Sequence, residues 1–185
     1  MCIRDSYWMD PENMEQMVCN IRDGLSQADP EHAGEYEENA AGQAALLHTW
    51  EDSLRDMLRE AEESAGVDIA GLVTFHDGFR YFAAAFDLPL LASIEEEEGS
   101  EASAKEINEI TGLVKEYSLP VIFTEVNGSD ATANAISRET GCQVAQLTML
   151  MDGPEEGDLS TYLEGVRSNV NTIVSFFGGE ELDQL

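Results

Sequence analysis

The sequence predicts an α/β fold: a four-stranded, mostly parallel sheet with helices on both faces, preceded by a long helix. Two observations carry this prediction. After residue 66, four short apolar runs alternate with four helical patterns, which is the order of a parallel sheet with crossover helices. Hydrophobic residues also make up 43% of the 185 residues, enough to build a core and to exclude wholesale disorder.

The first two expected helices precede the sheet. Residues 10–27 form one helix, with Asp10 as N-cap and Pro11 in its first turn. Its apolar face consists of Met14, Met17, Val18, Ile21 and Leu25. A second seam then continues over about 33 residues, or about 50 Å of helix. Its members are Tyr36, Ala40, Gln43, Leu47, Trp50, Leu54, Met57 and Ala61. A coiled coil is one interpretation; a backbone helix lying across two lobes is the other, and we favour it because a globular pattern follows.

The remaining elements alternate in type. Strands are expected within the apolar runs 67–75, 88–94, 119–125 and 142–150. Helices are expected within 77–87, 100–118, 129–141 and 158–179. In a sheet of this kind, ligands bind beyond the carboxyl ends of the strands.

Charge and cysteine content exclude several classes of function. There are 38 acidic residues against 9 basic ones, a net charge of −29, which argues against nucleic acid and anionic lipid as partners and suits cations. Cys2, Cys19 and Cys142 are scattered, so a zinc–thiolate site is not expected. No apolar run reaches about 18 residues, and "MCIRDS" is no signal peptide. We expect a truncated chain in which residues 1–6 are a foreign leader.

Several candidate ligands follow the strands. His76 ends the first run, the acidic residues 95–98 follow the second, Glu125 ends the third, and Asp152 follows the fourth. Imidazole and carboxylate together suit Zn²⁺ or Mn²⁺. Glu125 could orient His76 through a hydrogen bond. The alternative for His76 is a helix-start residue that binds loop carbonyls. Signatures of hydrolases, P-loop proteins and zinc proteases are absent from the sequence.

Five stretches together resemble zinc/manganese ABC-transporter substrate-binding proteins. They are "YWMDPENMEQMVCNI", "TFHDGFRYFAAAFDL", "EEEEGSEASAKEINEITGLVKEY", "LPVIFTEVNGSDATANAISRETG" and "YLEGVRSNVNTI". The resemblance implies two α/β lobes joined by one rigid helix, with a transported Zn²⁺ or Mn²⁺ held between them. It implies a periplasmic or lipid-anchored receptor that delivers metal to a membrane permease. The chain would comprise a remnant of the N-terminal lobe (1–28), the linking helix (29–65) and the C-terminal metal-binding lobe (66–185).

The family's ligands map onto this chain incompletely. His76 falls on the histidine of the family's C-terminal lobe. The family's His-x-Trp-x-Asp-Pro motif requires a histidine two residues before Trp8, where this chain has Ser6. The acidic ligand after the last strand would fall near Thr148, and Asp152 is the nearest carboxylate that follows. At most half of the ligand set is therefore expected here.

Three hypotheses follow. The chain is a metal-binding receptor truncated at its N-terminus, a small α/β enzyme using His76 and carboxylates, or a fragment that folds partly and has no function alone. The sequence upstream would separate the first two. A signal sequence, a first lobe and a His-x-Trp motif favour the receptor, whereas a catalytic motif favours the enzyme. Membrane association is expected only through a lost lipid anchor or the permease.

Overall fold

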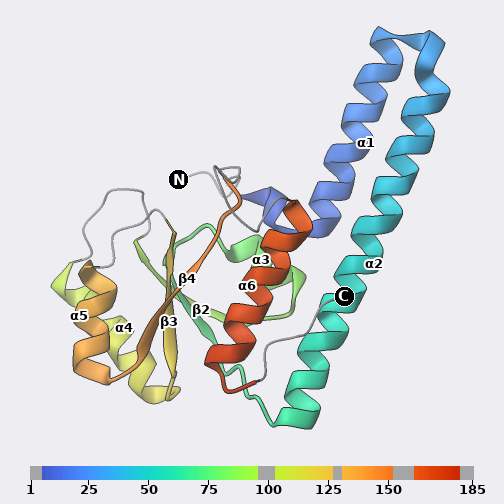
Figure 1. Ribbon diagram of the computed structural model, residues 1–185. Coiled ribbons are helices and arrows are strands. Elements are labelled where there is room, and N and C mark those ends of the chain that lie inside the picture. Colours follow the sequence, from blue (N-terminus) through green and yellow to red (C-terminus); the bar gives the residue numbers. More distant parts are fainter. Residues whose placement is uncertain (1–5, 96–102, 127–130, 152–160, 180–185) are drawn as a thin grey trace.

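The computed structural model describes residues 6–95, 103–126, 131–151 and 161–179, with the backbone alone at residues 64, 65, 76 and 95. Its centre is a sheet whose four strands are all parallel, in the order β2-β1-β3-β4 (Figure 1). The strands are β1 (Leu72–His76), β2 (Leu90–Glu95), β3 (Val121–Glu125) and β4 (Gln143–Leu147). The predicted four-stranded α/β sheet is confirmed.

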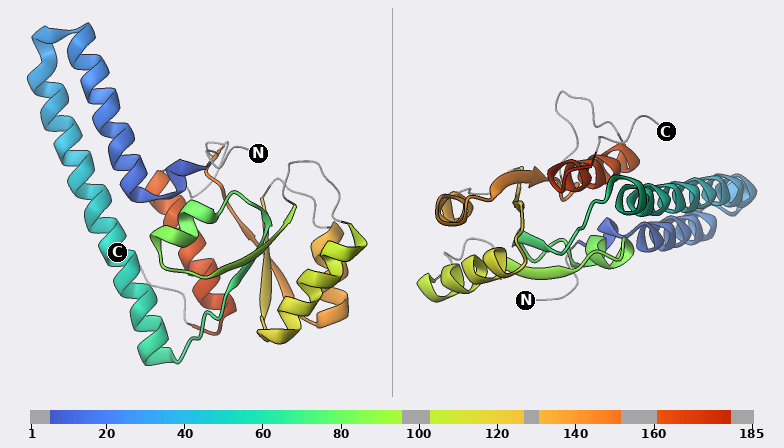
Figure 2. Two further views of the ribbon diagram at one scale, coloured as in Figure 1. Left: turned by 180° about the vertical axis from the view of Figure 1, so that it is seen from behind. Right: turned by 90° about the horizontal axis from the view of Figure 1, so that it is seen from below.

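Helices cover both faces of the sheet (Figure 2). They are α3 (Arg80–Ala85), α4 (Ala104–Glu116), α5 (Ala131–Thr140) and α6 (Tyr162–Phe176). Strand β3 shows why two layers are needed: Val121 and Phe123 pack into one apolar cluster, and Ile122 between them packs into the other. Because side chains alternate along a strand, a strand that is apolar throughout must be covered on both sides.

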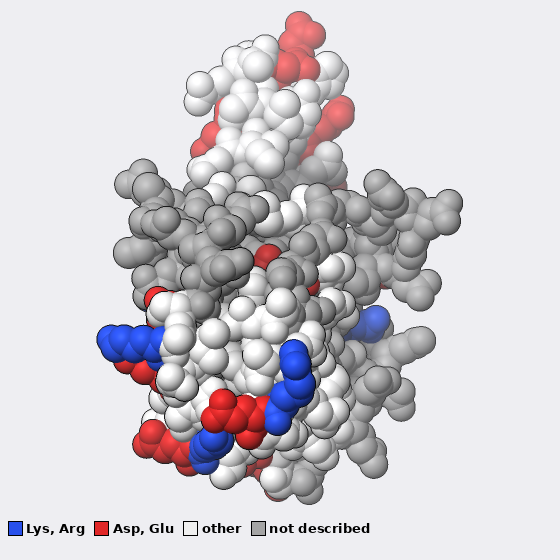
Figure 3. Space-filling view, turned by 90° about the vertical axis from the view of Figure 1, so that its left-hand side faces the viewer, with Lys and Arg blue, Asp and Glu red and all other residues white. Residues whose placement is uncertain are grey.

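The layer of α4 and α5 has a surface of paired charges. Lys115 lies 2.9 Å from Glu139 of the neighbouring helix, and Lys105 lies 3.4 Å from Glu109. Figure 3 shows acidic and basic side chains side by side on this face and acidic ones on the projecting part beyond it. Since most of the described basic residues have an acidic partner of this kind, the surface offers no basic patch for a phosphate backbone among the described residues.

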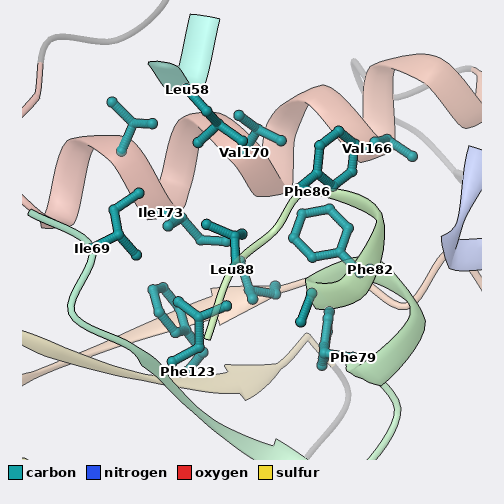
Figure 4. Packing of buried hydrophobic residues seen from close by; sticks show 14 of the residues in the cluster. Leu58, Ile69, Phe79, Phe82, Phe86, Leu88, Phe123, Val166, Val170 and Ile173 are labelled. Carbon is teal, nitrogen blue, oxygen red and sulfur yellow. The ribbon is translucent and has the colours of Figure 1, made fainter. Parts of the chain in front are cut away.

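The opposite face holds the larger core. Phe79, the N-cap of α3, and Phe82 within it belong to the same apolar cluster as Phe123 of β3 and residues of α6 (Figure 4). The phenylalanine rings 79 and 82 pack edge to face with centroids 6.3 Å apart. Val170 and Ile173 of α6 complete this layer, and both are fully buried.

A helical hairpin projects from the lobe (Figures 1 and 2). It consists of the 3-10 turn η1 (Tyr7–Met9), α1 (Pro11–Ala28), the turn η2 (Pro30–His32) and α2 (Ala33–Ala65). The far half of α2 pairs with α1, whereas Leu54, Leu58 and Ala61 of its near half join the lobe core. The predicted helices at 10–27 and 29–65 therefore exist, and α2 divides its apolar seam between two partners.

The first expected strand is shorter than its apolar run. Val67 and Ile69 are buried but lie in the connection that leads from α2 to β1. Gly66 adopts φ 65° at the end of α2, and the Val67 amide donates to the Ala61 carbonyl at 3.3 Å. This helix-end geometry carries both side chains into the main apolar cluster without strand pairing. Two buried apolar residues therefore did not indicate a strand here.

Candidate metal site

The order in which successive strands are added to the sheet reverses between β1 and β3, although all strands run parallel. From β1 the chain crosses to β2 on one side, and β3 and β4 follow on the other side. Thr74 of β1 is in register with Phe123 of β3, so His76 and Glu125, two residues further along each strand, end next to each other. Neighbouring strands lie about 4.8 Å apart. Such a reversal point, at the carboxyl ends, is where open α/β sheets bind ligands.

The structure brings some of the predicted site residues to this edge. His76 is also in register with Glu95 of β2, and Glu125 with Leu147 of β4. The Glu125 side chain is half-buried. Asp152 and the acidic residues 96–98 lie outside the described residues. Within the described part of the chain, no group of three or more histidine, cysteine and acidic side chains is arranged to hold a metal.

Asp77 directly follows His76, and its carboxylate forms an ion pair with Arg80. Nη2 of Arg80 lies 3.0 and 2.9 Å from the two carboxylate oxygens of Asp77. This ion pair spans the first turn of α3. The Asp77 carboxylate is therefore held at the start of that helix, which does not favour an acid–base pair with the histidine before it.

Ser6 lies beside the turn that follows His76. Ser6 is 0% exposed, and its hydroxyl has no hydrogen-bond partner among the described residues. A Cβ added to Gly78 would lie 3.2 Å from the Ser6 Oγ and would collide with the thioether of Met149. A side chain at position 78 would therefore require the Met149 thioether to move and would crowd the Ser6 hydroxyl.

The segment after β4 is fixed by two polar side chains. The amide of Asn169, which is 1% exposed, accepts from the Thr148 backbone N–H at 2.9 Å and donates to its carbonyl at 2.8 Å. The indole Nε1 of Trp8 donates to the Met149 carbonyl at 2.9 Å. These bonds occupy backbone groups that would otherwise continue the strand, which explains why β4 ends at Leu147 although its apolar run extends to residue 150.

Sequence reasoning missed Met149, Asn169 and the position of Trp8. The sequence contains a signal for Trp8, because Trp8 is the tryptophan of the His-x-Trp-x-Asp-Pro motif in which Ser6 takes the place of the histidine. For Asn169 there was none, since an asparagine on a helix is ordinarily exposed.

A charged cluster joins the hairpin to the lobe. Arg55 of α2 donates to Glu51, which is 5% exposed, at 2.8 Å, and to Asp87, after α3, at 3.2 Å. Burial raises the pKa of Asp10 at the start of α1. Burial and the nearby charges of Asp10 and Glu51 raise the pKa of Tyr162, the first residue of α6. One guanidinium thus balances several carboxylates at this joint.

Comparisons with known proteins give one family. The model of "ZnuA: Zinc-uptake complex component A periplasmic" matches residues 5–176. The iron-binding protein YfeA of Yersinia pestis is 30% identical over 92% of this chain and 54% of its own length. The manganese-binding lipoprotein MntA of Halalkalibacterium halodurans is 27% identical over 91% of this chain and 55% of its own length. The chain thus spans about half the length of these curated relatives.

A solved structure agrees with the fold. A mutant of the laminin-binding adhesin Lmb of Streptococcus agalactiae is 28% identical, with a TM-score of 0.81 over 93% of this chain and 62% of that one. Among the helices described here, none combines the length and apolar character needed to cross a membrane.

Proposed function

This chain belongs to the ZnuA family of periplasmic zinc-uptake components, and we propose that it is part of the substrate-binding component of a zinc or manganese ABC importer. The proposed metal site is supported by the adjacency of His76 and Glu125, which end the neighbouring strands β1 and β3 where the strand order reverses. The named ligands of the relatives, iron and manganese, favour a divalent transition metal over other cargoes.

His76 is the proposed metal ligand of this lobe. A neutral imidazole at the end of a buried strand is held on a rigid element, and a nearby carboxylate can fix its orientation. Glu125 is suited to that orienting role because its strand neighbours β1. Asp152 is proposed as a further ligand on the basis of its sequence position after β4. Acidic residues across the whole chain raise the local concentration of cations.

The domain assignment follows from the same premise. Residues 1–28 are proposed as a remnant of the first lobe, 29–65 as the linking helix, and 66–185 as the C-terminal lobe. The partners are then the metal ion and a membrane permease, and the location is the periplasm or, through a lipid anchor, the cell surface. The alternative of a small α/β enzyme has no support from the family match.

Replacing His76 by alanine tests the proposal. In a version extended by its upstream sequence, we expect His76→Ala to weaken Zn²⁺ or Mn²⁺ binding at least about tenfold, or about 1.4 kcal/mol, with the thermal midpoint retained. Titration calorimetry beside thermal unfolding measures both quantities. His48→Ala is the matched control, because His48 lies exposed on α2 beside Asp52.

The opposite pattern would contradict the proposal. If His76 only binds loop carbonyls, its removal lowers the stability by about 1 kcal/mol and leaves the metal affinity unchanged. In the 185-residue chain alone we expect weak binding, because Ser6 stands where the family has a histidine. Tight stoichiometric binding by this chain would show that it holds ligands that the proposed set lacks.

A further inference from the structure

We propose that Tyr162 is a latch between the lobe and the hairpin. A small tilt of the hairpin brings the Tyr162 hydroxyl onto the Asp10 carboxylate, so the joint between the two regions has an open and a closed form. The open form is the one described here, because in it the Tyr162 hydroxyl has no hydrogen-bond partner among the described residues. The latch does not depend on the metal ligands proposed above.

The donor of the latch belongs to the lobe. Tyr162 is the first residue of α6, and a capping box formed by Thr161 and Glu164 fixes this helix start. The hydroxyl oxygen of Tyr162 is buried, which is unfavourable for a polar group that forms no hydrogen bond. Burial and nearby carboxylates raise the pKa of Tyr162, so the phenol keeps its proton and remains a donor at neutral pH. A small movement that supplies an acceptor would satisfy it.

The acceptor belongs to the hairpin. Asp10 is the N-cap of α1, and its carboxylate accepts from the Glu12 amide at 2.9 Å and from Nδ2 of Asn13 at 3.1 Å. A carboxylate offers about four lone-pair sites, so these two bonds leave room for a third donor. Figures 1 and 2 show the start of α1 beside the start of α6. The Asp10 charge also contributes to the raised pKa of Tyr162, which places the carboxylate near the phenol.

Glu51 is the other carboxylate near the phenol, but it already has a strong partner. Its Oε1 accepts from Nε and Nη2 of Arg55 at 3.1 and 2.8 Å. Within the described part of the chain, Asp10 accepts no hydrogen bond from a guanidinium, and burial raises its pKa. A hydrogen bond from the phenol would stabilise the Asp10 charge and satisfy the buried hydroxyl at the same time. We therefore assign the acceptor to Asp10.

The contacts of α2 with the lobe allow a small tilt. The near half of this helix packs into the main core cluster and provides a pivot through Leu54, Leu58 and Ala61. The other contacts are polar: Nη1 of Arg55 lies 3.2 Å from the Asp87 carboxylate, and the Arg167 guanidinium lies 5.9 Å from the centre of the Trp50 ring. Both are made by long arginine side chains with many rotamers, so they can follow a small tilt without breaking.

The latch gives the joint a role in the receptor, and this step alone rests on the proposed function. If the hairpin carries the first lobe, its tilt sets how far the two lobes open, and Tyr162 influences that opening without being one of the proposed ligands. The experiments below contain no metal. Their failure would leave the metal site standing, and failure of the metal site would leave the latch standing.

A double-mutant cycle between Tyr162→Phe and Asp10→Ser tests the latch. Serine keeps an N-cap oxygen for α1 and removes the carboxylate. With Asp10 present, Tyr162→Phe should raise the unfolding equilibrium constant about tenfold, because a hydrogen bond to a charged acceptor is lost. In the Asp10→Ser background it should change the constant less than about twofold. Urea unfolding of the four chains measures this. Tyr117→Phe is the matched control, since Tyr117 is 42% exposed and follows α4.

Two other results of the cycle would overturn the latch. If the hydroxyl stays unpaired, Tyr162→Phe leaves the stability unchanged or raises it, because it removes a buried polar group without a partner. If Tyr162→Phe causes the same loss with and without the Asp10 carboxylate, the hydroxyl has another acceptor and the assignment of Asp10 is wrong.

The two forms of the joint have their own readout. Spin labels at Gln27, near the far end of α1, and at Glu116, at the end of α4, report the tilt through the distance between them, and both positions are exposed. In a background with the three native cysteines replaced, we expect two populations of label distance in the parent and one in Tyr162→Phe. The same distribution in both chains would show that the hydroxyl has no influence on the tilt, and the latch would be wrong.

Discussion

The sheet lobe and the helical hairpin contain similar apolar residues, but the two regions bury them very differently. In β3, Val121, Ile122 and Phe123 are all 0% exposed. In the hairpin, Ile21 and Leu25 of the predicted apolar face of α1 are 59% and 43% exposed. An apolar helical pattern therefore identifies which face of a helix is apolar, and it does not tell whether anything covers that face.

The difference has a structural origin. The central strands β1 and β3 are covered by helical layers on both sides, whereas α1 contacts α2 along one side only (Figure 1). Helix α2 contains both situations, because Leu54 is 1% exposed where it meets the lobe, and Leu46, two turns earlier, is not covered. Stability should accordingly be concentrated in the lobe and in the near half of α2.

The largest expected effect is in the core of the sheet. Phe123→Ala should lower the free energy of unfolding by about 3–5 kcal/mol, because it removes a fully buried ring that packs against α3 and α6. Ile21→Ala on the hairpin should change it by less than about 0.5 kcal/mol. Urea unfolding of both variants measures the contrast. Similar losses in the two would mean that the outer face of α1 is covered in solution, for example by a second copy of the chain.

A smaller but still substantial effect is expected at the joint between the two regions. Arg55→Met leaves the buried carboxylate of Glu51 without its ion-pair partner. It should lower the free energy of unfolding by about 1–3 kcal/mol, less than for a fully buried pair, because the Arg55 side chain is itself 37% exposed. Arg59→Met, one turn further along α2, removes an exposed pair with Asp56 and should cost at most about 1 kcal/mol. Equal, small losses in both would show that the Glu51 carboxylate is hydrated at the joint.

The same contrast explains what could be predicted from the sequence. Strand β1 with His76 at its end was predictable, because an apolar run flanked by turn residues has few other structures. A parallel sheet by itself places His76 and Glu125 at the same edge of the sheet. That β1 and β3 are neighbours, which makes the two residues adjacent, does not follow from the sequence pattern. The location of Val67 and Ile69 in a connection between α2 and β1 was not predictable, since a buried connection and a buried strand have the same apolar pattern.

Long-range contacts account for what was missed at the site. Trp8 and Met149 are 141 positions apart, and no periodic pattern links them. The bond pair between Asn169 and Thr148 is likewise a tertiary contact that local sequence does not encode. The sequence predicts residues 7–9 as part of a first-lobe remnant and residue 6 as the end of a foreign leader. Their burial against the lobe became visible only with the chain folded, because it depends on where η1 lies relative to β1 and β4.

The smallest expected effect concerns how helices of the two regions begin. Helix α4 of the lobe has a complete capping box, in which the Ser103 amide donates to the Glu106 carboxylate at 2.6 Å and the Glu106 amide donates to the Ser103 hydroxyl at 3.3 Å. Helix α2 of the hairpin begins at Ala33, and its N-cap residue His32 makes no side-chain capping bond. The hydrogen bonds of Ser103 lower the pKa of Glu106 below its ordinary value of 4.5.

A lowered carboxyl pKa in the folded state contributes stability that is present above the ordinary value and is lost as the pH falls through the folded value. Glu106→Gln retains an acceptor for the Ser103 amide and removes the charge. Its thermal midpoint should therefore lie slightly below that of the parent at pH 7, and the gap should close as the pH falls below 4.5. Glu109→Gln in the middle of the same helix, outside the capping box, should change the midpoint less. A gap that stays constant, or widens in acid, would mean that the capping box stabilises α4 through geometry alone and not through the charge of Glu106.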